Sequence, residues 1–256
     1  MIIDSHCHLG KDVVYDFEVT EDTILNNCME HNISGAIIQP CITRPYIVDT
    51  REAHDRIFRF CGLHPGRFWG MASVNPHFTR EDYEQEVCRC IYELGFVGVK
   101  LTPNGHAVDL SSRDACIVFD TARKLKIPVM VHTGMGIPFA DPTRLFPILM
   151  EYPDVVTVIA HAGSDFFASS AMFLAKKFDH VYLEPSGIGV EGIEMFLKNL
   201  PPSKIMFSTD VPIQTAGEVL KYTVASSDKA VLDQIFYLTA AKVFKLDLHQ
   251  IGKIEI

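Results

Sequence analysis

Short apolar runs recur along the chain, and stretches with helical spacing lie between them. The runs are rich in β-branched residues and lack polar interruptions, which is typical of parallel strands buried on both faces. They occupy residues 2–3, 35–38, 69–72, 97–100, 129–131, 155–160, 181–183 and 205–207. Helices are predicted over residues 81–94, 113–125, 142–152, 166–178 and 192–200, several of them after an Asp, Ser or Thr suited to an N-cap.

The alternation of strand and helix predicts the architecture. About eight such units in about 250 residues favour a closed (β/α)₈ barrel, a TIM barrel of the α/β class, over an open doubly wound sheet. Residues 230–248 carry an apolar face at helical spacing, so we expect C-terminal helices that pack on the outside of the barrel. The sequence contains no Pro- or Ser-rich linker and no low-complexity segment, so residues 1–256 are predicted to form one domain.

Composition narrows the classes of partner. The formal net charge of −9 argues against nucleic acid or an anionic membrane surface, because binding phosphates needs a concentrated positive field. We therefore expect a small-molecule substrate, and the sequence leaves open whether the chain forms a homo-oligomer. The seven cysteines are scattered without a CxxC pair, and no apolar run is long enough to span a bilayer. With no signal-like N-terminus, a reducing cytoplasm is the expected location.

Polar residues with metal-binding chemistry fall at the ends of the predicted strands. In a (β/α)₈ barrel, functional residues collect at the C-terminal strand ends. Because side chains alternate along a strand, both histidines of the first run project to one side, and the cysteine between them projects to the other. The residues at these ends are His6 and His8, Lys100, His132, His161 and Asp210.

This grouping predicts a metal site at the mouth of the barrel. Imidazole and carboxylate ligands together suit zinc, iron or manganese, and a catalytic site keeps one position open. The firm predicted ligands are His6, His8, His132 and Asp210, and zinc is the first choice of ion.

Five segments resemble successive motifs of the amidohydrolase superfamily, in particular its amidohydrolase-related (amidohydrolase 2) branch. They are IDSHCH at 3–8, GVKLTP at 98–103, VMVHTG at 129–134, VIAHAG at 158–163 and FSTDVP at 207–212. The resemblance implies that His6, His8 and Asp210 bind a first ion and that His132 completes or shares the site. It also implies that Asp210 accepts a proton from metal-bound water. His161 would then ligate a second ion or polarise the substrate as a free acid, so the metal count stays open.

Lys100 is the residue on which the metal count depends. In binuclear members of the superfamily a lysine in this place is carbamylated and bridges two ions, whereas a free ammonium would hold a substrate carboxylate as a point charge. The sequence departs from the common KLHP form of the motif, because Thr102 stands where the histidine would be. In the predicted loops after the strands, Arg44 and His106 are the candidate substrate-binding residues.

The leading functional hypothesis is a metal-dependent hydrolase of a small amide, cyclic amide, lactone or related ester, with Asp210 and His161 as catalytic residues. The alternative is non-oxidative decarboxylation of a small aromatic or unsaturated acid, since the same branch includes such lyases. A non-catalytic barrel that keeps its ligands is a third interpretation. A TatD-type nuclease is disfavoured, because those proteins generally carry glutamate where this chain has Lys100.

Overall fold

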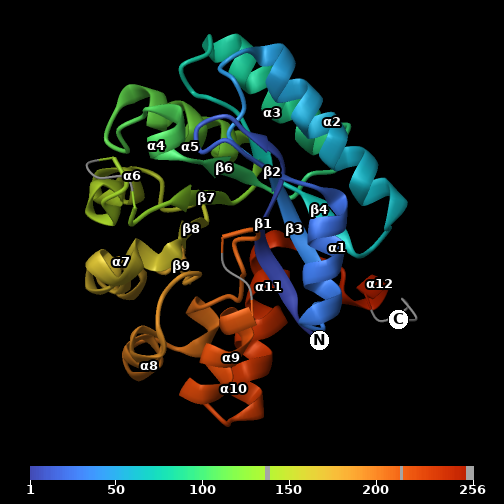
Figure 1. The fold of residues 1–256 in the computed structure, drawn as a ribbon. Coiled ribbons are helices and arrows are strands. Elements are labelled where there is room, and N and C mark those ends of the chain that lie inside the picture. Colours follow the sequence, from blue (N-terminus) through green and yellow to red (C-terminus); the bar gives the residue numbers. More distant parts are fainter. Residues whose placement is uncertain (136–138, 214–215, 252–256) are drawn as a thin grey trace.

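A computed structural model describes residues 1–135, 139–213 and 216–251, in which strands and helices alternate (Figure 1). The strands are β1 (Ile3–Asp12), β2 (Phe17–Val19), β3 (Gly35–Pro40), β4 (Phe68–Gly70), β5 (Ala72–Ser73), β6 (Val99–Leu101), β7 (Val129–His132), β8 (Thr157–Ala160) and β9 (Val181–Glu184). The longer helices are α1 (Glu21–Glu30), α2 (Ile47–Leu63), α3 (Arg80–Tyr92), α5 (Arg113–Leu125), α7 (Ser164–Lys177), α8 (Val190–Asn199) and α9 (Ala216–Ala225). Shorter helical segments are α4 (Pro103–His106), η1 (Pro142–Leu145), α6 (Phe146–Glu151), η2 (His161–Gly163), η3 (Pro202–Lys204), α10 (Lys229–Asp233), the π-helix η4 (Gln234–Leu238), α11 (Thr239–Phe244) and α12 (Leu248–Ile251).

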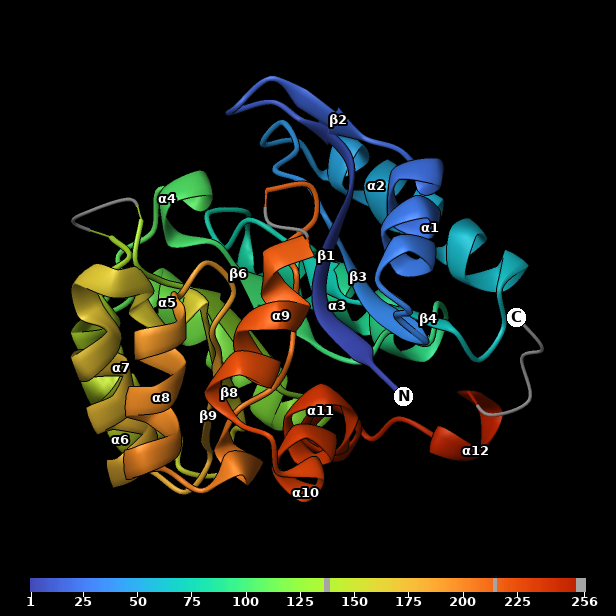
Figure 2. The ribbon, with the colours of Figure 1, turned by 60° about the horizontal axis from the view of Figure 1, so that its bottom comes forward.

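The strands form two sheets, and nearly all of their pairings are parallel. One sheet has the order β2-β1-β3-β4 and the other β5-β6-β7-β8-β9. The exception is the antiparallel pair of β1 and β2, which extends β1 into a hairpin beyond the sheet. Helices lie around the outside of the strands in both views (Figures 1 and 2). The predicted α/β class, with a parallel sheet and surrounding helices, is therefore confirmed.

The predicted eighth strand differs from expectation. Around residues 205–211 the structure has only two isolated parallel bridges, Leu183 with Ile205 and Cys7 with Val211. The ladder is interrupted because the N–H of Phe207 donates to the carbonyl of Ile235, outside the sheet, at 2.9 Å. This segment lies between β9 and β1 without forming a regular strand.

Two apolar clusters lie on opposite sides of the strands. Leu9, Val99 and Leu183 belong to the larger cluster, which includes buried residues of the surrounding helices. Ile3 and Met130 belong to the smaller cluster. The split follows the alternation of side chains along each strand.

The C-terminal helical region covers one end of the smaller cluster. Ala240, Val243 and Phe244 of α11 pack with Ile3 of β1 and Ile37 of β3. Ile235 and Phe236 of the same region belong to the larger cluster, so residues 230–248 contact both clusters. The expected C-terminal helices therefore pack against the strands, and one of them also covers apolar side chains at this end of the smaller cluster.

Local sequence explains where several helices begin. The side chain of Ser112 accepts from the N–H of Ala115 and caps α5, which spans the predicted range. Thr79 caps α3 in the same way through the N–H of Asp82. Within the described residues, no helix combines the length and the apolar character that a bilayer span requires.

Candidate functional site

A cavity of about 440 Å³ opens at the C-terminal ends of the strands. Its closed end is polar and buried, whereas the residues near its mouth are largely apolar. The lining residues with metal-binding or charged groups at this end are His8, Lys100, His132, His161 and Asp210, and the other polar lining residues are Asp12, Thr102, Asn104, Ser164, Asp165 and Ser186. The apolar and aromatic ones include Tyr15, Phe17, Ile42, Phe166 and Ile213. A mainly apolar cavity with a few convergent polar groups is the usual form of a small-molecule site.

Three predicted ligands converge at the closed end. The Nε2 atoms of His6 and His8 are 3.1 Å apart. Oδ1 of Asp210 lies 3.3 Å from the first nitrogen and 3.2 Å from the second. Atoms that share one ion at about 2.0–2.2 Å are themselves about 3 Å apart, so this spacing fits a single metal.

The other ring nitrogens of these histidines show which atoms face the ion. Nδ1 of His6 lies 2.7 Å from Oε2 of Glu184, and Nδ1 of His8 lies 3.2 Å from the carbonyl oxygen of Pro40. Both partners are acceptors, so each Nδ1 carries the proton and each Nε2 keeps a lone pair. Two lone pairs and a carboxylate oxygen then point at one spot, an arrangement that a cation stabilises. The described residues therefore fit a divalent metal.

The bend of β1 contributes to this convergence. The pairing of β1 with β3 shifts register between Asp4 and Cys7, which places His6 at the irregularity. Cys7 belongs to the larger apolar cluster, on the side of β1 opposite the histidines, as the strand alternation predicts.

Glu184 is a site residue that the sequence analysis did not assign. It ends β9, is completely buried, and accepts from Nδ1 of His6, from the N–H of Ser186 at 2.7 Å and from the N–H of His161 at 3.3 Å. Ser208 Oγ also donates to it. Its position at the end of the run 181–183 was the available signal, because the strand-end rule that selected Lys100 applies equally there. A carboxylate behind a ligating histidine fixes the ring and its tautomer.

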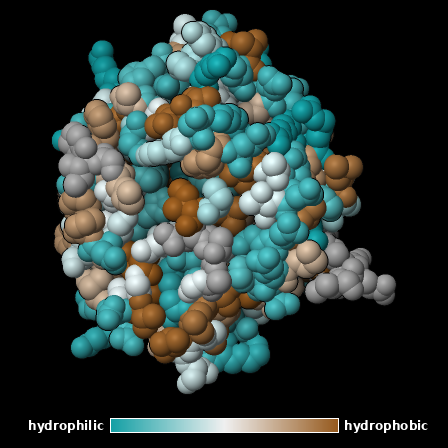
Figure 3. Space-filling view, in the orientation of Figure 1, coloured by the Kyte–Doolittle hydropathy of each residue, from teal (hydrophilic) through white to brown (hydrophobic). Residues whose placement is uncertain are grey.

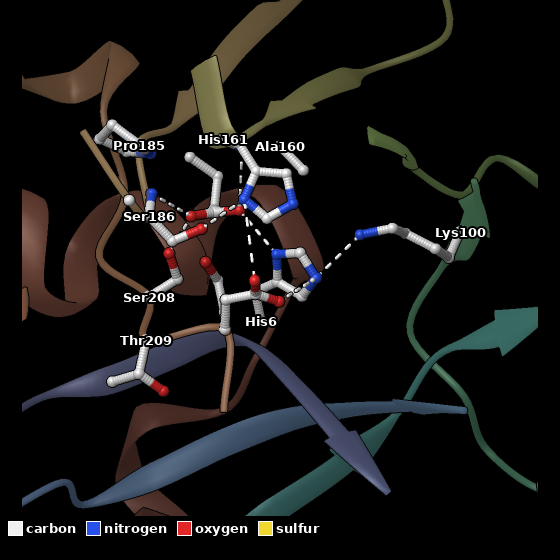
Figure 4. Close-up of polar contacts among 12 residues, drawn as sticks. His6, Lys100, Ala160, His161, Pro185, Ser186, Ser208 and Thr209 are labelled. Carbon is white, nitrogen blue, oxygen red and sulfur yellow. Dashed lines mark hydrogen bonds and ion pairs between the residues drawn. The ribbon is translucent and has the colours of Figure 1, made fainter. Parts of the chain in front are cut away.

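Lys100 approaches the same histidine from another side. Its Nζ lies 2.9 Å from Nε2 of His6, and Figure 4 shows the lysine on the side of the His6 ring opposite Ser186 and Ser208. Burial lowers the pKa of Lys100 to about 8. Burial also lowers the pKa of His6 well below its usual value, and the lysine charge adds to this effect. His6 is therefore neutral near pH 7, which is the form that binds a metal.

Asp210 sits in a left-handed backbone conformation with φ of 55°. Burial raises the pKa of its carboxyl group above the usual value. The residue before it, Thr209, is fixed by Asp4, whose Oδ1 accepts from the N–H of Thr209 at 3.0 Å. A non-glycine residue with positive φ is uncommon and is found often at functional sites.

His161 and His132 lie side by side, with ring centroids 4.7 Å apart. Nδ1 of His161 is 2.8 Å from Oγ of Ser186 and 4.0 Å from Oδ2 of Asp210. Nε2 of His132 instead contacts the carbonyl oxygen of Met135 at 2.8 Å. A second group of convergent ligand atoms combines His6, His161 and Glu184, and it shares His6 with the first group.

The chain matches the amidohydrolase family, Amidohydro_2, over residues 47–246. It belongs to this family. The motif resemblance seen in the sequence is thereby confirmed.

Most of the named relatives of this amidohydrolase family member are decarboxylases. Gamma-resorcylate decarboxylase from Rhodococcus jostii (strain RHA1) is 23% identical over 290 residues, which cover 89% of this chain and 88% of the relative. The structure of 2,6-dihydroxybenzoate decarboxylase from Rhizobium superposes with a TM-score of 0.78 at 18% identity, over 96% of this chain and 99% of that chain. Dihydroxybenzoic acid decarboxylase from Polaromonas sp. JS666, solved with manganese and 2-nitroresorcinol, also gives a TM-score of 0.78 at 18% identity, over 99% of each chain.

These relatives correct two expectations. The leading hypothesis of a hydrolase is wrong, because the relatives are named for decarboxylation, a lyase reaction, which is the alternative stated from the sequence. The preference for zinc finds no support either, since a solved relative contains manganese. What the site and the relatives support in common is a divalent metal and a small-molecule substrate.

The two predicted substrate-binding residues of this amidohydrolase family member lie outside the main cavity. Arg44 and His106 line a small neighbouring hollow together with Thr43 and Asn75. His106 is buried and accepts weakly from the N–H of Thr102 at 3.4 Å through Nδ1, and burial lowers its pKa to about 4. Their contact with substrate stays a prediction, as does ligation by His132.

A buried ion pair supports the loop beside His161. Glu218 and Lys221 of α9 pair with each other, and each also holds the backbone after β9. The N–H of Gly187 donates to Oε1 of Glu218 at 3.1 Å, and Nζ of Lys221 donates to the carbonyl of Pro185 at 2.6 Å. Ser186 lies between these two anchored residues and contacts His161, so we call Glu218 and Lys221 the loop clamp.

Proposed function

We propose that the chain catalyses metal-dependent, non-oxidative decarboxylation of a small aromatic or unsaturated acid. The observation that carries the proposal is the buried carboxyl group of Asp210, with its raised pKa, at the polar end of a cavity whose walls are apolar. Such a cavity suits a reaction that converts a carboxylate into apolar carbon dioxide and needs one proton. The names of the relatives support the same class of reaction.

We propose that one divalent ion, manganese by preference, is held by His6, His8 and Asp210. The three atoms that face one another support this set, and the manganese in a solved relative supports the choice of ion. His132 and His161 stay candidate ligands beside it. We favour one ion over two because the second group of ligand atoms shares His6 and is already occupied by hydrogen bonds to Glu184. When bound, the ion supplies positive charge that polarises the oxygens of an anionic substrate.

The remaining steps are assigned to side chains of the chain itself. Lys100 holds the substrate carboxylate as a point charge, which a carbamylated lysine could not do. Phe17 and Ile42 exclude water from the ring. The bond between the carboxyl carbon and the ring carbon breaks, its electron pair stays on the ring carbon, and carbon dioxide leaves.

Asp210 then supplies the proton that the ring carbon takes. Oδ1 faces the two histidines, whereas Oδ2 lies on the side of His161 and is available to carry a proton. Desolvation of this carboxyl group favours its protonated form, as a general acid requires. Burial lowers the pKa of His161, so its ring is neutral and acts as a relay: it takes a proton from water at one ring nitrogen as the other passes one to Oδ2 of Asp210, and Ser186 positions the ring.

We also propose that residues 205–211 act as the eighth strand of a closed (β/α)₈ barrel. The bridges of Ile205 to Leu183 and of Val211 to Cys7 support this, because they connect the segment to β9 on one side and β1 on the other.

One large apolar cluster runs from Cys7 to Phe236 and supports a single domain over residues 1–256. All seven cysteines are free, which agrees with a reducing cytoplasm.

The test is carbon dioxide release from 2,6-dihydroxybenzoate by protein loaded with manganese, before and after removal of the metal with a chelator. We expect release that depends on metal. Substitution of Asp210→Asn should lower the rate by about 100-fold or more while the protein stays folded, because a general acid contributes 10²–10⁴-fold. Full activity of the folded Asp210→Asn variant would refute its role as proton donor.

A further inference from the structure

The charged side chains of the cavity are unevenly distributed between its closed end and its outer part. Among its described lining residues, Lys100 is the sole lysine or arginine. The undescribed segments 136–138 and 214–215 adjoin the lining residues Met135 and Ile213, and their sequences, Gly-Ile-Pro and Gln-Thr, carry no charge. Lys100 lies at the closed end, next to His6, so the positive charge is concentrated there.

The carboxylates of the cavity are distributed differently. Besides Asp210, the lining includes Asp12 at the end of β1, next to the turn of the β1–β2 hairpin, and Asp165 at the start of α7. Oδ1 of Asp12 accepts from the N–H groups of Val14 and Tyr15, at 2.9 and 2.8 Å, and Oδ2 accepts from Ile42 at 3.1 Å. These bonds fix the carboxylate of Asp12 in place. The outer part of the cavity therefore carries two carboxylates, and none of its described lining residues is a lysine or arginine.

The apolar residues near the mouth provide no ionic partner. Phe17, Ile42, Phe166 and Ile213 are apolar, and Thr102 and Asn104 offer neutral hydrogen-bonding groups. The face in Figure 3 shows hydrophobic side chains in separate patches among hydrophilic ones. Neutral polar groups suit hydroxyl substituents, whereas a charged group brought against these walls would lose water without gaining a counter-ion.

We propose that the cavity selects acids with one carboxylate and rejects acids with a second one. Lys100 holds the single carboxylate, and the rest of the ring carries hydrogen, hydroxyl or other neutral substituents. A second carboxylate would meet apolar walls and the charges of Asp12 and Asp165, so it would bind unpaired. This inference rests on the proposed function, which it narrows to monocarboxylic substrates.

The experiment compares pairs of ligands that differ in charge and hardly in size. Derivatives of 2,6-dihydroxybenzoate that carry either a carboxamide or a carboxylate at ring position 3 or 4 are given to manganese-loaded protein. We expect kcat/KM for carbon dioxide release to be at least about 10-fold lower for each dicarboxylate than for the matching amide, as an uncompensated buried charge requires. Values within about threefold of each other would overturn the inference.

Binding measured by calorimetry with the same pairs separates this inference from the proposed function. It needs no turnover, so a protein that prefers the amide by about 10-fold in Kd but releases no carbon dioxide supports the charge selection and refutes decarboxylation of these acids. If dicarboxylates are turned over at the rate of the matching amides, decarboxylation is supported and the charge selection is refuted. If Arg44→Ala then abolished that turnover, Arg44 would be a second anion anchor, and a single-carboxylate cavity would be wrong.

A substitution at the rim tests whether charge is the cause. Phe166 is 81% exposed on α7, so replacing it should leave the fold intact. Phe166→Arg should reduce the preference for the amide by about threefold or more, because it adds a cation within reach of the substrate. Phe166→Gln is the matched neutral control and should keep the preference. Equal preferences in the two variants would show that shape, and not charge, discriminates.

Discussion

Glu184 provides the sharpest test of the metal site, because it does not belong to the proposed ligand set and acts on the site through its hydrogen bond to His6. Its two oxygens accept four donors: Nδ1 of His6, the N–H groups of Ser186 and His161, and the hydroxyl of Ser208. Substitution Glu184→Gln keeps the shape but replaces one acceptor oxygen by an NH₂ group, which cannot accept from these donors. If Nδ1 of His6 loses its acceptor, the ring can place its proton on Nε2, and the lone pair that faces the ion disappears.

The expected magnitude follows from the general cost of removing such a supporting carboxylate. Metal affinity should fall by about 10–100-fold, which corresponds to about 1.4–2.7 kcal/mol. The dissociation constant for Mn²⁺ is measured by competition with a chromophoric chelator, and thermal unfolding confirms that the variant is folded. Ser208→Ala is the matched control. It removes a donor to Oε1 and leaves the bond between Oε2 and His6, so its affinity should change by less than about threefold.

A folded Glu184→Gln variant with the affinity of the wild-type protein would refute this reasoning. That result would mean that His6 keeps its tautomer without the carboxylate or that His6 does not bind the metal. A similar loss in Ser208→Ala would assign the effect to the general packing of β9 and not to the contact with His6.

Two further predictions concern the surroundings of the site. Lys221→Met removes the bond to the carbonyl of Pro185 and leaves Glu218 buried without its partner, so we expect a lower melting temperature and a kcat reduced by about 10-fold. Lys221→Arg should restore part of kcat, and an unchanged kcat in the folded methionine variant would contradict the loop clamp. Burial lowers the pKa of His106 to about 4, so the unfolded chain binds a proton below pH 6.5 that the folded chain does not, and stability is lost as pH falls from 6.5 towards 4. His106→Gln should therefore reduce the loss of unfolding free energy between pH 7.5 and 5.5 by about 1 kcal/mol in urea titrations, and an unaltered pH dependence would count against it.

The rule that barrel chemistry lies at strand ends explains which residues could be found from the sequence. It selected a set of residues that meet at the closed end of the cavity or line it, namely His6, His8, Lys100, His132, His161 and Asp210. Their residue types identify them, because histidines and lysines are rare at the ends of buried strands. Glu184 follows the same rule, but a single acidic residue after an apolar run is also the ordinary start of a loop.

Other features could not be predicted because they depend on the direction in which a side chain or a backbone N–H group points. Arg44 lies in the loop after β3 and His106 ends α4 after β6, as expected for residues that follow strands, yet this position does not determine which hollow a side chain enters. Residues 205–207 have the composition of a strand, but the N–H of Phe207 donates to Ile235 outside the sheet, while its carbonyl accepts from Ser5 of β1.

The hydrolase hypothesis is wrong for a related reason. The ligands that suit a hydrolase also suit a decarboxylase, and the difference lies in what the cavity presents to the substrate.

The most direct test of decarboxylation is the fate of the carboxylate in deuterated water. An excess of manganese-loaded protein is mixed with 2,6-dihydroxybenzoate. The carbon dioxide and the ring product are then quantified by mass spectrometry. We predict one carbon dioxide per ring and one deuterium at the carbon that carried the carboxylate, with neither product formed after metal removal. Consumption of the acid without carbon dioxide, or no reaction by protein shown to hold its metal, would contradict the proposed decarboxylation of this acid.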